Sequence, residues 1–226
     1  MFKKEFYKFK DIYLLLVVLI ASFLAYLAFS LKDMVQNFGA LSVNLSFLFK
    51  KKFTFFHLDD MNLIFAFVIA VFVFFHERIS GRLRLSLHFP HSSVRNIGFI
   101  IMCGLLFVFF VYFVEMMLLN IILGTVYAKE IMYVLNYSLS LNYIFGFLLY
   151  IFCCGFIIEP VKKRAIVNFI VMLGSIYLYY EINPDIYALD SFYANDLGFY
   201  YMGIVALYAL SAAFIAFDNY KRGYIK

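Results

Sequence analysis

Residues 76–96 read HERISGRLRLSLHFPHSSVRN and separate two strongly apolar segments of the chain. This stretch carries four arginines against one glutamate. Loops rich in Lys and Arg stay on the cytoplasmic side of a membrane when the segments beside them span it. The stretch therefore predicts a cytoplasmic loop between two membrane-spanning helices.

The composition of the whole chain indicates an integral membrane protein. Of its 226 residues, 65% are apolar and 15% are charged, and the mean hydropathy is +0.90. A soluble domain carries about 25% charged residues, and a spanning helix needs about 20 mostly apolar residues. We therefore expect an all-α protein with one domain of six transmembrane helices. Nucleic acid is excluded as a partner, because no soluble face remains on which basic residues could cluster.

Six apolar segments fit such spans, at about 12–31, 61–75, 97 to between 114 and 124, 141–158, 165–180 and 199–217. An earlier start for the fourth span stays open. The loop 32–60 contains a short apolar piece, 43–49, which is too short to cross and predicts a surface or re-entrant helix on the outer side. Residues 181–198 form the outer loop between the fifth and sixth spans.

The distribution of basic residues predicts the orientation. The segments 1–10, 76–96, 159–164 and 218–226 hold fourteen of the nineteen Lys and Arg residues. The positive-inside rule places these four segments in the cytoplasm, and both termini with them. We expect the first span to be retained, because its apolar run is too long for a cleaved signal peptide.

Residues 1–10 have the pattern of a helix that lies in the headgroup layer. Phe2, Phe6 and Phe9 share one helical face, and Lys4 and Lys8 lie on the opposite face. The alternative is a basic flank that only orients the first span. We favour the interfacial helix.

Within the loop 76–96, apolar residues recur at helical spacing. Ile79, Leu83 and Leu87 follow at i, i+4 and i+8, which places them on one ridge of a short helix. Pro90 would end that helix. Alternate leucines also fit a strand, but a lone strand beside a membrane has no pairing partner. A charged loop that only fixes orientation is the simpler alternative.

The order of Glu77, Gly81, a leucine-bearing stretch, Pro90 and Arg95 resembles the loop between the second and third spans of type-2 ABC transporter permeases. The resemblance implies that Glu77 closes the second span, that 79–87 is the coupling helix, and that 1–10 is the interfacial elbow helix. It assigns contact with a partner subunit to Glu77, Ile79, Gly81, Arg82, Leu83, Arg84, Leu87, Pro90 and Arg95. The chain departs from the family in being short, and in Arg84, where many members are acidic or neutral.

The family resemblance implies a transport subunit, most simply of an exporter, in a bacterial inner membrane. None of the eleven glycines belongs to a G-x-x-x-x-G-K-[ST] motif, so this chain lacks a Walker A loop. We expect no enzyme activity and no cofactor on it. ATP and Mg²⁺ would bind to a separate cytoplasmic ATPase subunit, and a second permease copy or a paralogue would complete the assembly in the lipid. The alternative function is a non-transporting membrane anchor or assembly subunit. The sequence does not indicate the substrate.

Glu115 is the one ionisable residue inside an apolar run, and Asn120 follows five residues later. A carboxylate at mid-depth in a membrane is costly and marks a functional candidate. Both residues are therefore candidates for a translocation path. If the third span ends near Val114, however, Glu115 lies in the outer headgroup layer, and both readings stay open.

No metal site is expected. The three cysteines, Cys103, Cys153 and Cys154, lie in apolar runs and are typical of small buried residues. The histidines lack the carboxylate or thiolate partners that would complete a ligand set.

Two further patterns concern packing. Five tyrosines at the ends of the last two spans predict an aromatic belt at the outer interface: Tyr177, Tyr179, Tyr180, Tyr200 and Tyr201. Four alanines predict close packing of the sixth span on another helix: Ala209, Ala212, Ala213 and Ala216.

Overall fold

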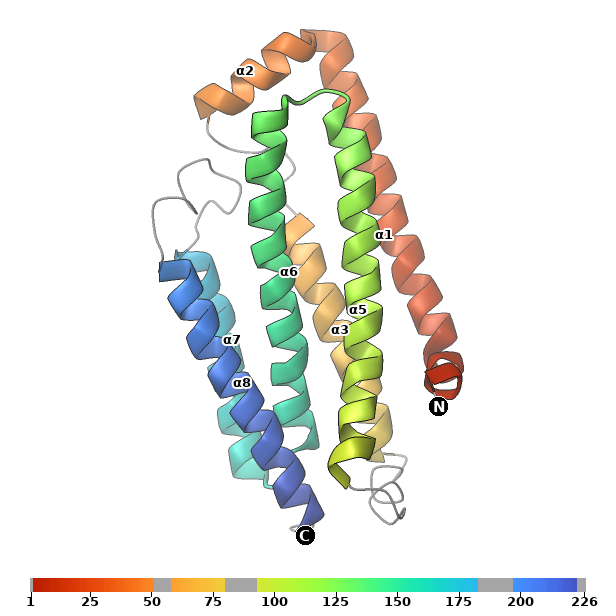
Figure 1. Ribbon diagram of the computed structural model, residues 1–226, viewed down its shortest axis with the longest axis vertical. Coiled ribbons are helices and arrows are strands. Elements are labelled where there is room, and N and C mark those ends of the chain that lie inside the picture. Colours follow the sequence, from red (N-terminus) through yellow and green to blue (C-terminus); the bar gives the residue numbers. More distant parts are fainter. Residues whose placement is uncertain (1, 51–57, 80–92, 183–196, 223–226) are drawn as a thin grey trace.

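The protein is a bundle of long α-helices (Figure 1). The computed structural model describes residues 2–50, 58–79, 93–182 and 197–222. These residues form seven helices: α1 (Phe2–Phe38), α2 (Ala40–Lys50), α3 (Leu58–Ile79), α5 (Ser93–Gly124), α6 (Lys129–Ile158), α7 (Lys162–Ile182) and α8 (Leu197–Lys221). All except α2 are long and apolar enough to cross a membrane. The prediction of an all-α membrane protein with six spans is confirmed.

Helix α6 lies at the centre of the bundle and packs against α3, α5, α7 and α8, whereas α1 packs on α5 (Figure 1). Its glycines allow close approach. A Cβ atom on Gly155 would lie 3.1 Å from both the backbone and the Cβ of Ala212 on α8. The four alanines predicted to pack closely, Ala209, Ala212, Ala213 and Ala216, are buried as well. The predicted close packing of the sixth span is thus confirmed, and its partner is α6.

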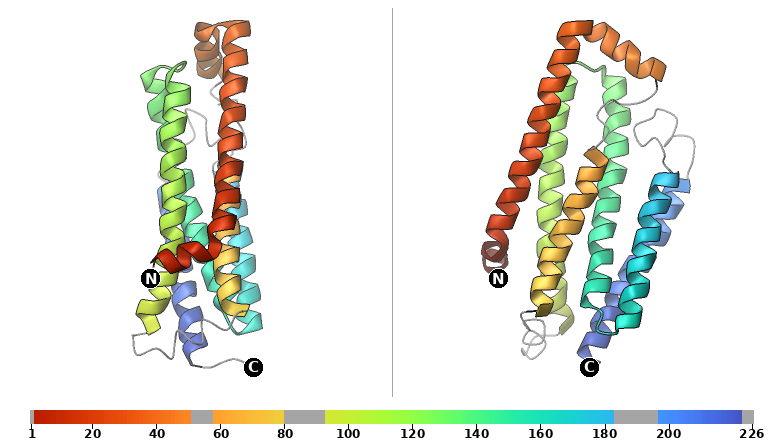
Figure 2. Two further views of the ribbon diagram at one scale, coloured as in Figure 1. Left: turned by 90° about the vertical axis from the view of Figure 1, so that its right-hand side faces the viewer. Right: turned by 180° about the vertical axis from the view of Figure 1, so that it is seen from behind.

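The N-terminal segment is not a separate helix. It forms the first turns of α1, and Figure 2 shows that these turns run across the long axis of the bundle before the helix turns to follow it. The start of α1 and the end of α8 lie at the same end of the bundle (Figure 1), as an even number of spans requires. We call this the terminal end.

Helix α2 confirms the helix predicted around residues 43–49 and lies across the opposite end of the bundle (Figure 1). Gly39 joins it to α1 with φ of +78°, a conformation that favours glycine. The Asn44 amide donates to the Val126 carbonyl at 2.7 Å, and its oxygen accepts from the Ala128 N–H at 3.1 Å. These bonds fix α2 on the turn between α5 and α6, so α2 is a surface helix.

Helices α5 and α6 make a longer hairpin than their hydropathy suggests. Helix α5 continues to Gly124, and α6 begins at Lys129, well before the expected start near residue 141. Asn120 and Asn136 exchange two amide hydrogen bonds, of 3.0 and 2.8 Å, within this hairpin. Because these amides satisfy each other, the helices can continue through polar positions.

The predicted tyrosine belt is only partly correct. Tyr177 and Tyr200 are exposed, but Tyr179 is fully buried and stacks on Phe145 with a centroid separation of 4.1 Å. Tyr201 is also buried, and its hydroxyl donates to the Ser175 carbonyl. The prediction is therefore wrong for Tyr179 and Tyr201, whose rings pack inside the bundle.

Candidate functional site

The sequence placed its main candidate site in the loop 76–96, and the structure describes the two ends of that stretch. Glu77 and Ile79 belong to the last turn of α3, and Arg95 belongs to the first turn of α5. The other six candidates lie outside the described residues: Gly81, Arg82, Leu83, Arg84, Leu87 and Pro90. Ile79 is the last described residue of α3, and the remainder of the predicted coupling helix, 80–87, lies outside the described residues.

The first turns of α1 are fastened to the last turn of α3. The Lys8 ammonium forms an ion pair with Glu77 Oε1, and the two side chains are only 11% and 4% exposed. Phe9, which follows Lys8, and His76, which precedes Glu77, make an edge-to-face ring contact with a centroid separation of 5.6 Å. Removing one partner of a shielded ion pair strands the other charge. The N-terminal segment and the end of α3 are therefore held as one unit.

Two further contacts tie α3, α6 and α8 together at the terminal end. Arg78 Nη1 donates to the Ile157 carbonyl at 2.6 Å, at the negative end of the α6 dipole. The buried Glu159 carboxylate accepts from the Asn219 amide of α8 at 3.0 and 3.1 Å. We call Lys8, Glu77, Arg78, Glu159 and Asn219 the loop base, because they brace the helix end from which residues 80–92 depart.

A second candidate site lies inside the bundle around Glu115, near the start of α3 and the end of α7. Its side chain is 1% exposed, and Oε1 accepts a hydrogen bond from the Tyr143 hydroxyl of α6 at 3.2 Å. The Asn62 side chain of α3 lies beside the same carboxyl group. Oε2 is buried and has no hydrogen-bond partner among the described residues. Helix α5 continues to Gly124, so Glu115 lies within the helix and not at its end.

Hydrogen bonds extend this site across four helices. The Asn62 amide donates to Asn142 Oδ1 at 3.1 Å, and the Asn142 amide donates to the Tyr179 hydroxyl at 3.2 Å. The Tyr112 hydroxyl donates to the Asn62 carbonyl at 2.7 Å. We call Asn62, Tyr112, Glu115, Asn142, Tyr143 and Tyr179 the polar layer. Sequence reasoning found only Glu115 of this set, although asparagines inside apolar spans were a usable signal.

Asn120, the other predicted path residue, does not join the polar layer. Its amide group exchanges hydrogen bonds with the Asn136 amide and also donates to the Met116 carbonyl at 2.8 Å. This side chain holds α5 to α6.

No protein-family model matches the chain, and comparisons with curated proteins and with solved structures find no match. The fold and the sequence define the class: an integral membrane protein with six long apolar helices, a braced loop base and a buried polar layer.

Proposed function

We propose that this chain is the transmembrane subunit of an ATP-driven exporter of the type-2 ABC permease kind, paired with a second permease and served by a separate nucleotide-binding subunit. The observation that carries the proposal is the ion pair between Lys8 and Glu77. It fastens a bent N-terminal segment to the last turn of α3, directly before residues 80–92. In the family that the sequence resembles, the elbow helix and the coupling helix occupy these two positions.

The loop base would transmit movement from residues 80–92 to the helices. A push on residues 80–92 by a soluble subunit would be passed to α3, and through the ion pair to the start of α1. Arg78 links the same turn to the end of α6. Because packed helices move as rigid bodies between discrete arrangements, the push would shift α3 against its neighbours.

We propose that this shift of α3 changes the hydrogen bonds of the polar layer. The bond between Asn62 of α3 and Asn142 of α6 must lengthen or exchange partners if α3 moves along α6. Glu115 lies beside Asn62, and its carboxyl group would line the translocation path. Asn120 keeps its structural role in this scheme, and the path role falls to Glu115.

The second candidate function is a membrane anchor that docks a soluble complex without transport. The close packing at the polar layer favours it, because Tyr112 and Tyr143 stack with a centroid separation of 4.5 Å beside Glu115. An anchor would use the same loop base but would need no response to ATP.

Purification with natural partners separates the two functions. The protein is extracted from its native membrane in a mild detergent, its partners are identified by mass spectrometry, and ATP hydrolysis is measured after reconstitution. Gly81→Arg and Leu83→Glu should abolish the stimulation of ATP hydrolysis while membrane insertion stays intact. Leu45→Glu, on an exposed position of α2 at the opposite end, is the control and should keep stimulation. An ATP-hydrolysing partner that is stimulated equally by all variants, or no such partner, contradicts the proposal.

A further inference from the structure

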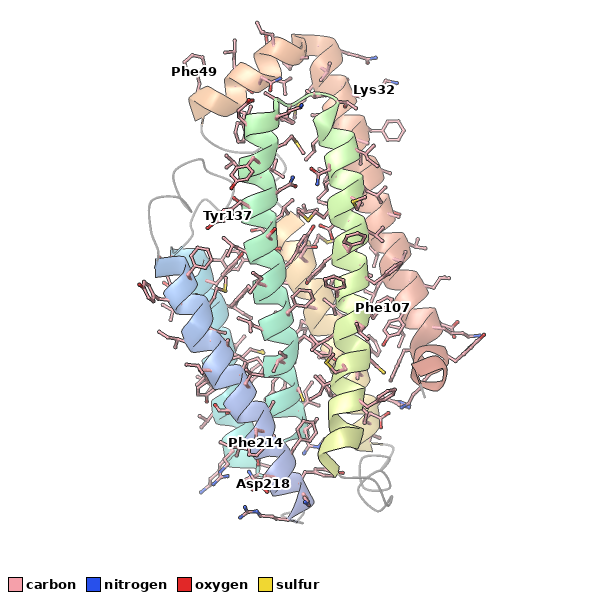
Figure 3. All side chains as sticks on the ribbon, viewed as in Figure 1. Lys32, Phe49, Phe107, Tyr137, Phe214 and Asp218 are labelled. Carbon is pink, nitrogen blue, oxygen red and sulfur yellow. The ribbon has the colours of Figure 1, made fainter. Side chains whose placement is uncertain are left out.

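A groove of about 380 Å³ lies between α7 and α8 near the terminal end. Lys163 and Arg164, in the first turn of α7, form its polar rim, and Val167 and Ile215 are among its apolar wall residues. Figure 3 places Phe214 and Asp218 of α8 at this end of the bundle. The groove therefore runs from a basic rim along the surface of two spans.

Apart from Ser211, whose hydroxyl donates to the Tyr208 carbonyl, the exposed side chains of the groove are either basic or apolar. Lys163 and Arg164 are exposed, whereas Val167 and Ile215 keep 54% and 46% of their surface exposed although they are apolar. Basic pockets between spans on the cytoplasmic side of a membrane bind anionic lipid headgroups. An apolar wall that continues from such a rim along the span fits an acyl chain.

The other polar groups of the groove have partners within the protein. The Tyr208 hydroxyl donates to Asn168 Oδ1 at 3.1 Å, and the Asn168 amide donates to the Gly155 carbonyl at 3.4 Å. Glu159 also lines the groove, but it is 1% exposed and its oxygens accept from Asn219 and from the Val161 N–H. The charge that the rim presents outward is thus the positive charge of Lys163 and Arg164.

We propose that this groove binds an anionic phospholipid of the surrounding membrane, with its phosphate on Lys163 and Arg164 and one acyl chain along Val167 and Ile215. The N-terminus of α7 adds the positive end of a helix dipole at the same rim. A phospholipid fits better than a free phosphate, because the apolar walls need an occupant as well. Both α7 and α8 pack on α6, and the lipid fills the space between them. The inference does not depend on the proposed function.

Native mass spectrometry of the full-length protein in detergent tests the proposal, with phosphatidylglycerol and phosphatidylcholine of identical chains as probes. We expect phosphatidylglycerol to be retained preferentially. The double variant Lys163→Gln/Arg164→Gln should reduce that preference roughly tenfold or more, since each basic residue near a lipid surface contributes about 1 kcal/mol. The double variant Lys162→Gln/Lys221→Gln is the control. It removes the same charge at the same end from exposed residues outside the groove, and it should keep the preference.

Two further arms test the acyl chain. Val167→Phe fills the groove without a change of charge and should weaken phosphatidylglycerol binding several-fold. Glycerol 3-phosphate should not compete at equal concentration. The proposal is overturned if the two charge variants lose lipid equally, if phosphatidylcholine binds as well as phosphatidylglycerol, if Val167→Phe binds like the unsubstituted protein, or if glycerol 3-phosphate displaces the lipid.

Discussion

Lys8 of α1 and Glu77 of α3 form an ion pair that is largely shielded from its surroundings, and it joins the start of the chain to the helix end from which residues 80–92 depart. Two shielded charges in contact are sensitive to the loss of either one, because the remaining charge keeps its desolvation cost without its partner. An exchange of the two residues keeps the attraction.

Lys8→Ala should therefore destabilise the protein, by about 3–5 kcal/mol if the site behaves like other buried pairs. The midpoint of heat-induced loss of the monodisperse peak in detergent is the measurement. Lys10→Ala, two residues away and exposed, is the control and should leave the midpoint unchanged. The exchange Lys8→Glu/Glu77→Lys should recover part of the loss. Equal midpoints for the two alanine variants would show that the pair does not stabilise the fold.

Gly155→Val should loosen the contact between α6 and α8. A Cβ atom there meets Ala212 at 3.1 Å, whereas one on Gly174 of α7 meets nothing within 4 Å. Overpacking of this kind costs about 1–3 kcal/mol. The same heating assay should rank Gly155→Val well below Gly174→Val. A reversed or equal ranking would mean that α6 and α8 do not pack as described.

Glu115 should be found as a neutral acid. An ionised carboxylate buried without an ion pair is costly, and no ion pair to Glu115 is found among the described residues. Dicyclohexylcarbodiimide enters apolar regions and reacts with protonated carboxyl groups. Peptide mass spectrometry should find it on Glu115 and not on the exposed Glu130, and Glu115→Gln should remove the label. Labelling of Glu130 alone would contradict the burial of Glu115.

Asn44→Ala should release α2 from the turn between α5 and α6. It removes the two hydrogen bonds that join α2 to this turn, each with a net contribution of about 0.5–1.5 kcal/mol, and one bond within α2 to the Ala40 carbonyl. Amide hydrogen exchange in residues 40–50 should accelerate on the order of tenfold, since about 1.4 kcal/mol is a factor of ten. Asn37→Ala, at an exposed position of α1, should leave this exchange unchanged. If both variants exchange alike, α2 is held by its apolar face alone.

The sequence was sufficient to locate the spans but not all of their ends. Hydropathy identifies six apolar helices, and the short apolar piece at 43–49 predicts α2. The start of α6 was left open, as residue 141 or earlier, because Asn136, Ser138 and Ser140 lower the local hydropathy. In the fold, Asn136 pairs with Asn120, and the two serine hydroxyls donate to carbonyls four residues earlier. Such partners come from the neighbouring helix or the preceding turn, so a sliding average of apolarity does not register them.

The surroundings of individual side chains were less predictable than the spans. Whether a tyrosine near a helix end meets lipid or protein depends on the rotation of that helix, which is set by its neighbours. Tyr177 faces outward, and Tyr179 stacks on Phe145 of α6. Likewise, the polar character of Glu115 was visible in the sequence, but its contact with Tyr143 depends on how α5 meets α6.

Photo-crosslinking from residue 83 in living cells tests the central claim most directly. Benzoylphenylalanine is placed at Leu83, the cells are irradiated, and the attached protein is identified by mass spectrometry, with the same label at Leu45 of α2 as the control. The account predicts that position 83, and not position 45, captures a soluble subunit with a Walker A motif. Capture of a protein without a nucleotide site, or of no protein at all, would contradict it.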